Sequence, residues 1–170
     1  MAEITNAYRQ SVPAMRFIGK KYGDSDRVNG GFGVKWGEWF SNDWFGIIEK
    51  QGSSKLKEIY EDGDAYIGLM RWKEGDPFEY WIGLFMSENT TVPVGFEFID
   101  FPKGELGVCW LYGKEDDLYC KEDKCAAKLK EEGYKLIPDE KGAWWFFERY
   151  GCPRFTTPDE QGNVILDICH

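Results

Sequence analysis

The order of strand-like and helix-like segments repeats once along the chain, and this repeat limits the possible folds more than any other feature. In the first half, residues 16–22 predict a strand. Two further apolar runs, residues 65–72 and 78–86, flank the turn-forming residues 73–77 and predict a hairpin. Between them, apolar residues recur three or four positions apart, as in a helix that Asp43 and its neighbours can kink: Phe32, Trp36, Phe40, Trp44, Ile47 and Ile48.

The second half follows the same order. Residues 96–101 and 106–112 are strand-like, residues 116–132 carry the thin apolar stripe of an amphipathic helix that Gly133 ends, and two apolar strands close the chain. Two such strand-helix-strand-strand units predict an α+β fold with a pseudo-two-fold axis, an antiparallel sheet and a central ligand groove between the halves.

Length and charge narrow the class of protein. The chain has 170 residues, so we expect a single domain over residues 1–170, with halves at about 14–90 and 91–170. The net charge of -9 argues against a nucleic-acid partner, because phosphate binding needs clustered basic side chains. No apolar stretch is long enough to span a membrane, so we expect no membrane partner. The sequence leaves a monomer and a homodimer equally open.

The cysteines and the start of the chain indicate a cytoplasmic protein. The first fifteen residues lack the basic start and apolar run of a secretory signal. An odd number of cysteines without the spacing of a secreted scaffold is typical of free thiols. The spacing is also unlike that of a zinc site, and the only histidine is the last residue, so we expect no metal and no cofactor. The residues weighed for zinc are Cys120, Cys125, Cys152, Cys169 and His170.

Aromatic residues make up 17% of the chain, which favours either an aromatic core or an aromatic-walled pocket for a flat or cationic ligand. Glu148 is the most informative single residue, because it lies inside the apolar strand Trp144–Tyr150. If its side chain faces outward, it is an ordinary solvated charge. If it faces inward, burial raises its pKa unless a partner or a bound cation compensates. Both interpretations stay open at this point.

Two segments resemble a known family. Residues 93–106, with the sequence PVGFEFIDFPKGEL, are similar to the strand-turn-strand of the GyrI-like small-molecule-binding domains. Phe-Glu-Arg-Tyr at residues 147–150, followed by a last apolar strand, resembles the glutamate-bearing end of that family. The resemblance covers about residues 14–169 and implies a pocket between two related halves, lined by aromatic side chains, with Glu148 at its floor.

The resemblance also implies functions. Some relatives are the effector sensors of bacterial transcription regulators and bind lipophilic cations. Others stand alone and resemble hydrolases that protect cells by opening the strained cyclopropane of DNA-alkylating toxins. Because the domain pattern begins near residue 14, we expect a stand-alone protein without a helix-turn-helix. Three functions stay open: a cyclopropanoid hydrolase, a non-catalytic multidrug-binding or sequestering protein, and a gyrase-inhibitor-like protein-interaction module.

The hydrolase hypothesis assigns roles to individual residues. Glu148 would act as the general base for a water molecule. Tyr112, at the end of a strand, would donate a hydrogen bond to the developing phenolate. The partner in every version of the binding site is a hydrophobic aromatic small molecule. The candidate walls of its pocket, each of which has a core role as the alternative, are Trp36, Trp72, Tyr80, Trp110 and Trp145.

Overall fold

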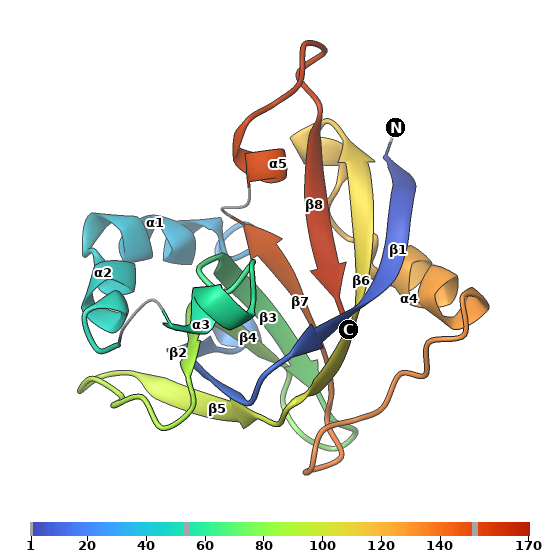
Figure 1. Ribbon diagram of the computed structural model, residues 1–170. Helices are drawn as coiled ribbons and strands as arrows, with labels where there is room; N and C mark the ends of the chain where they lie inside the picture. The colour runs from blue at the N-terminus through green and yellow to red at the C-terminus, as the bar shows by residue number, and fades with distance from the viewer. Residues whose placement is uncertain (1, 53–54, 151–152) are drawn as a thin grey trace.

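The computed structural model describes residues 2–52, 55–150 and 153–170 (Figure 1). Its described strands form one eight-stranded antiparallel sheet in the order β1-β6-β8-β7-β3-β4-β2-β5. The elements are β1 (Glu3–Val12), β2 (Met15–Tyr22), η1 (Asp24–Asp26), α1 (Gly33–Ser41), α2 (Trp44–Glu49), α3 (Lys55–Ile59), β3 (Tyr66–Trp72), β4 (Glu79–Ser87), β5 (Glu97–Phe101), β6 (Gly104–Gly113), η2 (Glu115–Asp117), α4 (Glu122–Glu131), β7 (Trp144–Tyr150), α5 (Pro153–Thr156) and β8 (Val164–Cys169).

The strand order has an internal symmetry. If β1 to β4 are renumbered β5 to β8, and β5 to β8 are renumbered β1 to β4, the order β1-β6-β8-β7-β3-β4-β2-β5 becomes its own reverse. The α+β fold of two strand-helix-strand-strand units is therefore confirmed, and each unit carries one more strand at its start. The strand missing from the sequence-based prediction is β1, whose side chains are mostly polar and exposed because it lies at the edge of the sheet.

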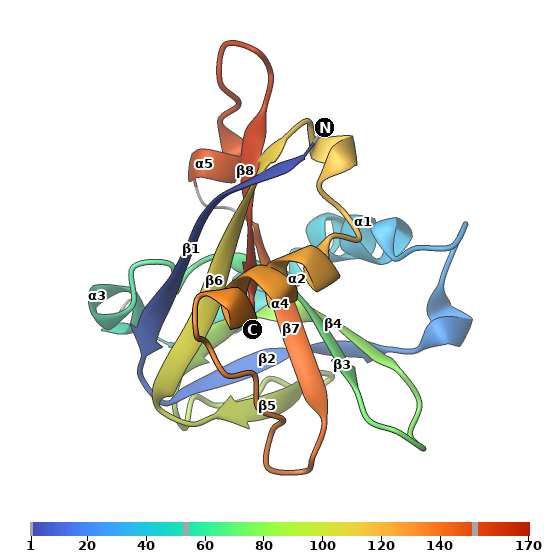
Figure 2. The ribbon, with the colours of Figure 1, turned by 90° about the vertical axis from the view of Figure 1, so that its right-hand side faces the viewer.

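The sheet curls strongly. β1 and β2 are joined by residues 13–14 alone, although five strands separate them in the sheet, and β5 and β6 are joined by residues 102–103. Such a short connection reaches only about 10 Å. The two ends of the sheet must therefore approach each other, as Figures 1 and 2 show. We call the face inside this curl the inner face and the other the outer face.

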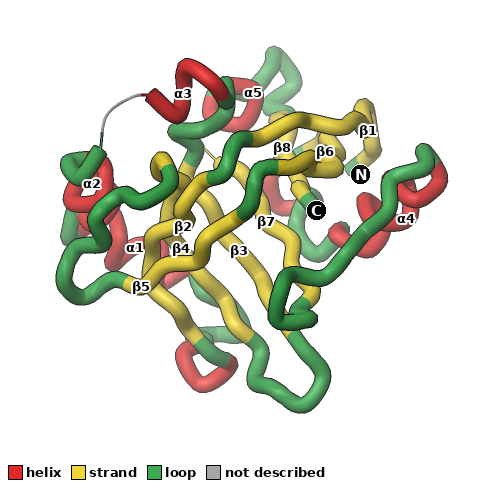
Figure 3. The backbone as a smooth tube through the Cα atoms, turned by 60° about the horizontal axis from the view of Figure 1, so that its bottom comes forward, coloured by secondary structure: helices red, strands yellow, loops and turns green. Residues whose placement is uncertain are grey.

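Each face carries its own core. Phe17, Leu69 and Phe147 are buried on the inner face, where Tyr60, just after α3, joins them. On the outer face, α1 and α2 bury Trp39, Phe45 and Ile48 against β4 and its neighbours, and α4 packs on β1 and β6 through Cys125 and other side chains. The central strands β3 and β7 thus lie between two groups of helices (Figure 3).

Local sequence explains where the helices end. Asp43 adopts a left-handed conformation (φ 52°) between α1 and α2 and accounts for the predicted kink. Gly133 (φ 90°) follows α4, and the amide of Tyr134 donates to the carbonyl of Leu129 (2.8 Å), as in a glycine-terminated helix. Within the described residues, no helix is long and apolar enough to cross a membrane.

Candidate functional site

Strand β7 sends its side chains alternately to the two faces. Phe147 and Arg149 belong to the inner face, so Phe146, Glu148 and Tyr150 belong to the outer face, between the two helix groups. Glu148 is 9% exposed. The carboxylate inside the apolar strand is therefore buried on the face that the helices cover.

Aromatic side chains converge on Glu148. The Tyr150 hydroxyl donates a hydrogen bond to Glu148 Oε1 (2.7 Å). On the neighbouring strand β3, Gly68 pairs with Glu148 and contributes no side chain. A Cβ atom at Gly68 would lie 2.9 Å from the Tyr80 hydroxyl, 3.3 Å from the ring of Trp36 and 3.5 Å from the ring of Tyr150.

These rings also support one another. The indole Nε1 of Trp36 donates to the hydroxyl oxygen of Tyr80 (2.9 Å), which joins α1 to β4 above Gly68. Tyr80 in turn stacks on Phe32, with ring centroids 4.1 Å apart. Because Tyr80 is buried with an indole donor on its oxygen, its own proton is left to point toward a further acceptor.

The electrostatic environment of Glu148 is negative. Burial raises its pKa to about 7, the hydrogen bond from Tyr150 opposes this rise, and the charge of Glu122 adds to it. Tyr119 lies nearby and donates to Glu115 Oε1 (3.0 Å); burial, Glu115 and Glu148 together raise the pKa of Tyr119. Within the described chain, no basic side chain contributes to the pKa of Glu148.

The neighbouring basic residue points away from Glu148. Arg149 is fully buried on the inner face, where its Nε donates to Asp167 Oδ2 (2.8 Å) and its Nη1 to the Tyr60 hydroxyl (2.7 Å). Asp62 lies 3.4 Å from Arg149 Nη1. The charge of Arg149 is therefore balanced by two carboxylates on the opposite face of the sheet.

A related network surrounds Arg71 on β3. Arg71 pairs with Glu79 across β3 and β4, just as Arg149 pairs with Asp167 across β7 and β8. Its Nε donates to Asp139 Oδ2 (2.8 Å), in the loop before β7, whereas Asp62 lies in the loop before β3. The two halves thus exchange a loop aspartate, which extends the symmetry of the strand order to side chains.

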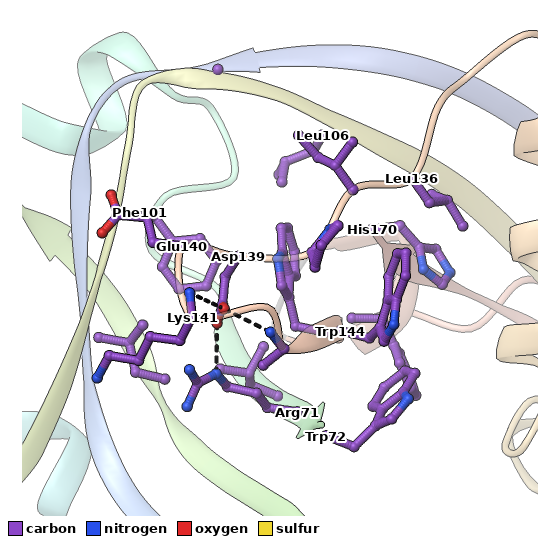
Figure 4. Close-up of a pocket in the computed structure, with 18 of the residues that line it drawn as sticks. Arg71, Trp72, Phe101, Leu106, Leu136, Asp139, Glu140, Lys141, Trp144 and His170 are labelled. Carbon is purple, nitrogen blue, oxygen red and sulfur yellow. Dashed lines mark hydrogen bonds and ion pairs between the residues drawn. The ribbon is translucent and has the colours of Figure 1, made fainter. Parts of the chain in front are cut away.

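A large cavity lies at the end of the sheet beyond the last residue of β8 (Figure 4). β8 ends at Cys169, so the start of β7 and the start of β6 have no strand between them. The cavity has a volume of about 1670 Å³ and is covered by the loop that contains Asp139. Trp72 and Trp144 are 40% and 44% exposed beside it. Phe146 also lines it, about 7 Å along β7 from Glu148.

The structure brings some of the predicted residues to Glu148. Trp36 and Tyr80 lie there. Trp72 lies at the cavity instead. Trp145 faces the inner core, where its ring packs against those of Phe101 and Phe147 (centroids 5.1 and 5.9 Å apart), although part of it reaches the cavity.

The other two predicted residues also lie away from Glu148. Trp110 packs on the inner face against Tyr8, with Arg154 over its ring. The hydroxyl of Tyr112, the predicted donor, lies at the surface, where it binds Asp159 and accepts from Asn163 Nδ2 (3.1 Å). The structure thus places the Tyr112 hydroxyl away from Glu148, whereas the hydroxyl of Tyr150 binds the carboxylate and that of Tyr80 lies beside Gly68, opposite Glu148.

The residues weighed for zinc are dispersed. Cys125 is buried on the outer face beside Cys109, Cys169 is buried on the inner face, and Cys120 is exposed. Cys152 lies outside the described residues. In the part of the chain that the structure describes, no three acidic, cysteine or histidine side chains are grouped as metal ligands.

Comparison with known proteins gives a fold. No protein-family model and no curated protein sequence matches the chain. Among solved structures, SAV2435 bound to tetraphenylphosphonium is similar over 97% of this chain and 92% of its own, with a TM-score of 0.60 and 12% identity.

Two further solved structures are similar to this chain over most of its length. The C-terminal domain of EcmrR is similar over 96% of this chain and 94% of its own, with a TM-score of 0.54 and 12% identity. A hydrolase encoded by lin2189 from Listeria innocua covers 96% and 90%, with a TM-score of 0.52 and 14% identity. At these identities the likeness establishes the fold alone, and this fold is consistent with the GyrI-like fold that the sequence resemblance implies.

Proposed function

We propose that the protein binds a hydrophobic aromatic small molecule that carries a positive charge, with Glu148 as its counter-ion. The observation that carries this proposal is Glu148 itself, a residue that is 9% exposed and whose carboxylate lies among aromatic rings without a basic partner in the described chain. Buried charges are ordinarily paired, and burial of this one is unfavourable until a cation neutralises it. A ligand cation supplies the missing charge.

The surroundings of Glu148 support a cationic ligand over a neutral one. Glu115 and Glu122 add negative charge on the side of α4, and the whole chain carries a net charge of -9. A protein with the same fold, SAV2435, has been solved bound to tetraphenylphosphonium, an aromatic cation.

The test compares two variants of one residue type. Glu148→Gln keeps the shape and removes the charge, and we expect the Kd for tetraphenylphosphonium to rise at least about 10-fold, as for the loss of a buried charge partner. Glu140→Gln, in the exposed loop beside the cavity, should leave the Kd unchanged. Isothermal titration calorimetry at pH 8 measures both. An unchanged Kd in Glu148→Gln would show that this carboxylate is not the counter-ion.

A second pair of variants locates the ligand. If the aromatic cation binds at Glu148, Trp36→Phe should weaken binding and Trp144→Phe should not, because Trp144 lies at the cavity of Figure 4. The reverse result would place the ligand in the cavity. Binding of a partner protein with no affinity for small molecules would instead favour the interaction-module hypothesis.

Hydrolysis of a cyclopropane-bearing alkylator is the second candidate function. A carboxylate with a pKa of about 7 is suited to accept a proton from water at neutral pH. The water oxygen would bond to a ring carbon as the strained C–C bond breaks, and the electron pair would pass to the aromatic system as a phenolate. The Tyr80 hydroxyl, which accepts from Trp36 and keeps its own proton, would donate to that phenolate.

Mass spectrometry distinguishes the enzyme from the binder. A hydrolase would add one water to many equivalents of the alkylator, and Glu148→Gln would lower the rate at least about 100-fold. A binder would protect the alkylator stoichiometrically, without a product of higher mass. Full turnover by Glu148→Gln would exclude this carboxylate as the base.

A further inference from the structure

The two oxygens of the Glu148 carboxylate have different environments. Oε1 accepts the hydrogen bond of Tyr150 (2.7 Å). Oε2 has no hydrogen-bond partner in the described part of the chain, although an ionised carboxylate can accept several hydrogen bonds. Oε2 is not among the fully buried side-chain atoms that lack a partner in the described chain, so it reaches the accessible surface and is the atom to which a bound ligand can donate.

The space between Glu148 and the neighbouring strand β3 is narrow. Gly68 leaves strand β3 without a side chain opposite Glu148, and this space is taken by the Tyr80 hydroxyl and the edge of Trp36, 2.9 and 3.3 Å from the position of a Cβ atom. Tyr150 closes another side at 3.5 Å from the same point. Glu148 as a whole residue is only 9% exposed. A small donor fits such an opening better than a bulky group does.

We infer that the positive charge of the ligand is a protonated amine that donates an N–H hydrogen bond to Oε2, rather than a quaternary centre. This inference rests on the proposed function. An N–H donor approaches a carboxylate oxygen to about 2.7–2.9 Å. A quaternary nitrogen is surrounded by carbon, so its charge stays farther from the oxygen, where the Coulomb attraction is weaker, and Oε2 remains without a donor.

The test uses two ligands that differ at one group. 1-Pyrenylmethyl-dimethylamine is protonated at pH 8, and its N-methylated form, 1-pyrenylmethyl-trimethylammonium, carries the same charge without an N–H. We expect the amine to bind the wild-type protein at least about 10-fold more tightly, as a charge-assisted hydrogen bond predicts. Pyrene fluorescence measures both Kd values. Equal affinities, or tighter binding of the trimethylammonium, would overturn the inference.

The same experiment separates this inference from the proposed function. If tetraphenylphosphonium binds through Glu148 but the amine does not, the proposed function stands and the inference fails. If neither pyrene cation nor tetraphenylphosphonium binds, both fail.

A glycine variant tests the narrow approach. In Gly68→Ala the added methyl must displace the Tyr80 hydroxyl, so we expect the amine to bind at least about 10-fold more weakly. Gly37→Ala, in α1, is the matched control, because a Cβ atom there meets nothing within 4 Å. Thermal unfolding confirms that both variants fold. A folded Gly68→Ala protein with unchanged affinity for the amine would contradict the proposed geometry.

Discussion

At the scale of single residues, Glu148 titrates near neutral pH, since burial raises its pKa to about 7. A cation binds the ionised form better, so we expect affinity for tetraphenylphosphonium to increase about 10-fold from about pH 6 to about pH 8 and then to level off. Calorimetric titrations across this range measure the effect. A profile that is equally steep in Glu148→Gln would assign it to another group.

Ionisation of Glu148 favours cation binding but lowers the stability of the ligand-free protein. The folded-state pKa of Glu148, about 7, exceeds the ordinary value of 4.5, so the native state binds more protons than the unfolded state between these values. The stability of the ligand-free protein should therefore fall as pH rises from about 4.5 to about 7, and stay low above that. At pH 8, Glu148→Gln should be more stable by up to about 3 kcal/mol. Urea unfolding at pH 5 and 8 measures this difference. A variant less stable than wild type at pH 8 would contradict it.

At the scale of elements, the two arginine networks provide a matched pair. Arg149 has no exposed side-chain surface and is held by Asp167 and Asp62, whereas Arg71 is 15% exposed with Glu79 and Asp139. Arg149→Met removes the buried cation of Asp167 and Asp62 and leaves them with Arg154, which is 22% exposed, so it should cost about 3–5 kcal/mol. Arg71→Met should cost less, because water reaches its partners. Urea unfolding measures the loss of stability in both variants. Equal losses would show that the burial of the arginine does not determine their size.

Alternation along β7 explains which site residues the sequence could predict. The position of a carboxylate inside an apolar strand singles out Glu148. Because neighbouring side chains point to opposite faces, Trp145 does not share the face of Glu148, and Tyr150 does. This rule alone identifies Tyr150 from the sequence. By contrast, the meeting of Trp36 and Tyr80 above Gly68 depends on how α1 lies on β4, which no local pattern encodes.

The strands also differ in whether a local sequence pattern reveals them. Seven of the eight strands in the described chain are visible in the sequence as apolar runs bounded by turns, because at least one face of each is buried or, in β5, half-buried. β1 presents mostly polar side chains to solvent and carries no such signal. The position of each strand in the sheet is set by long-range pairing, so the approximate order of elements was predictable and the curl of the sheet was not.

At the scale of the whole molecule, the edge strands cross between the halves. β1 pairs with β6, and β5 pairs with β2. A fragment of residues 1–90 lacks the partner of β1, and a fragment of residues 91–170 lacks the partner of β5. We expect neither fragment to fold alone and the two to associate when mixed. Circular dichroism of each fragment and of the mixture measures this. A fragment that folds by itself would show that the halves are separate domains.

The pairing of β1 with β6 also has a consequence for synthesis on the ribosome. Glu3 lies opposite Tyr112 and Val12 opposite Gly104, so about a hundred residues are translated after β1 before its partner β6 exists. The central strand β3 is likewise translated long before its partner β7. Pairings this distant in sequence form slowly and leave strand edges uncovered in the meantime. The nascent chain therefore depends on the polar side chains of β1 to stay free of aggregation until β6 has been made.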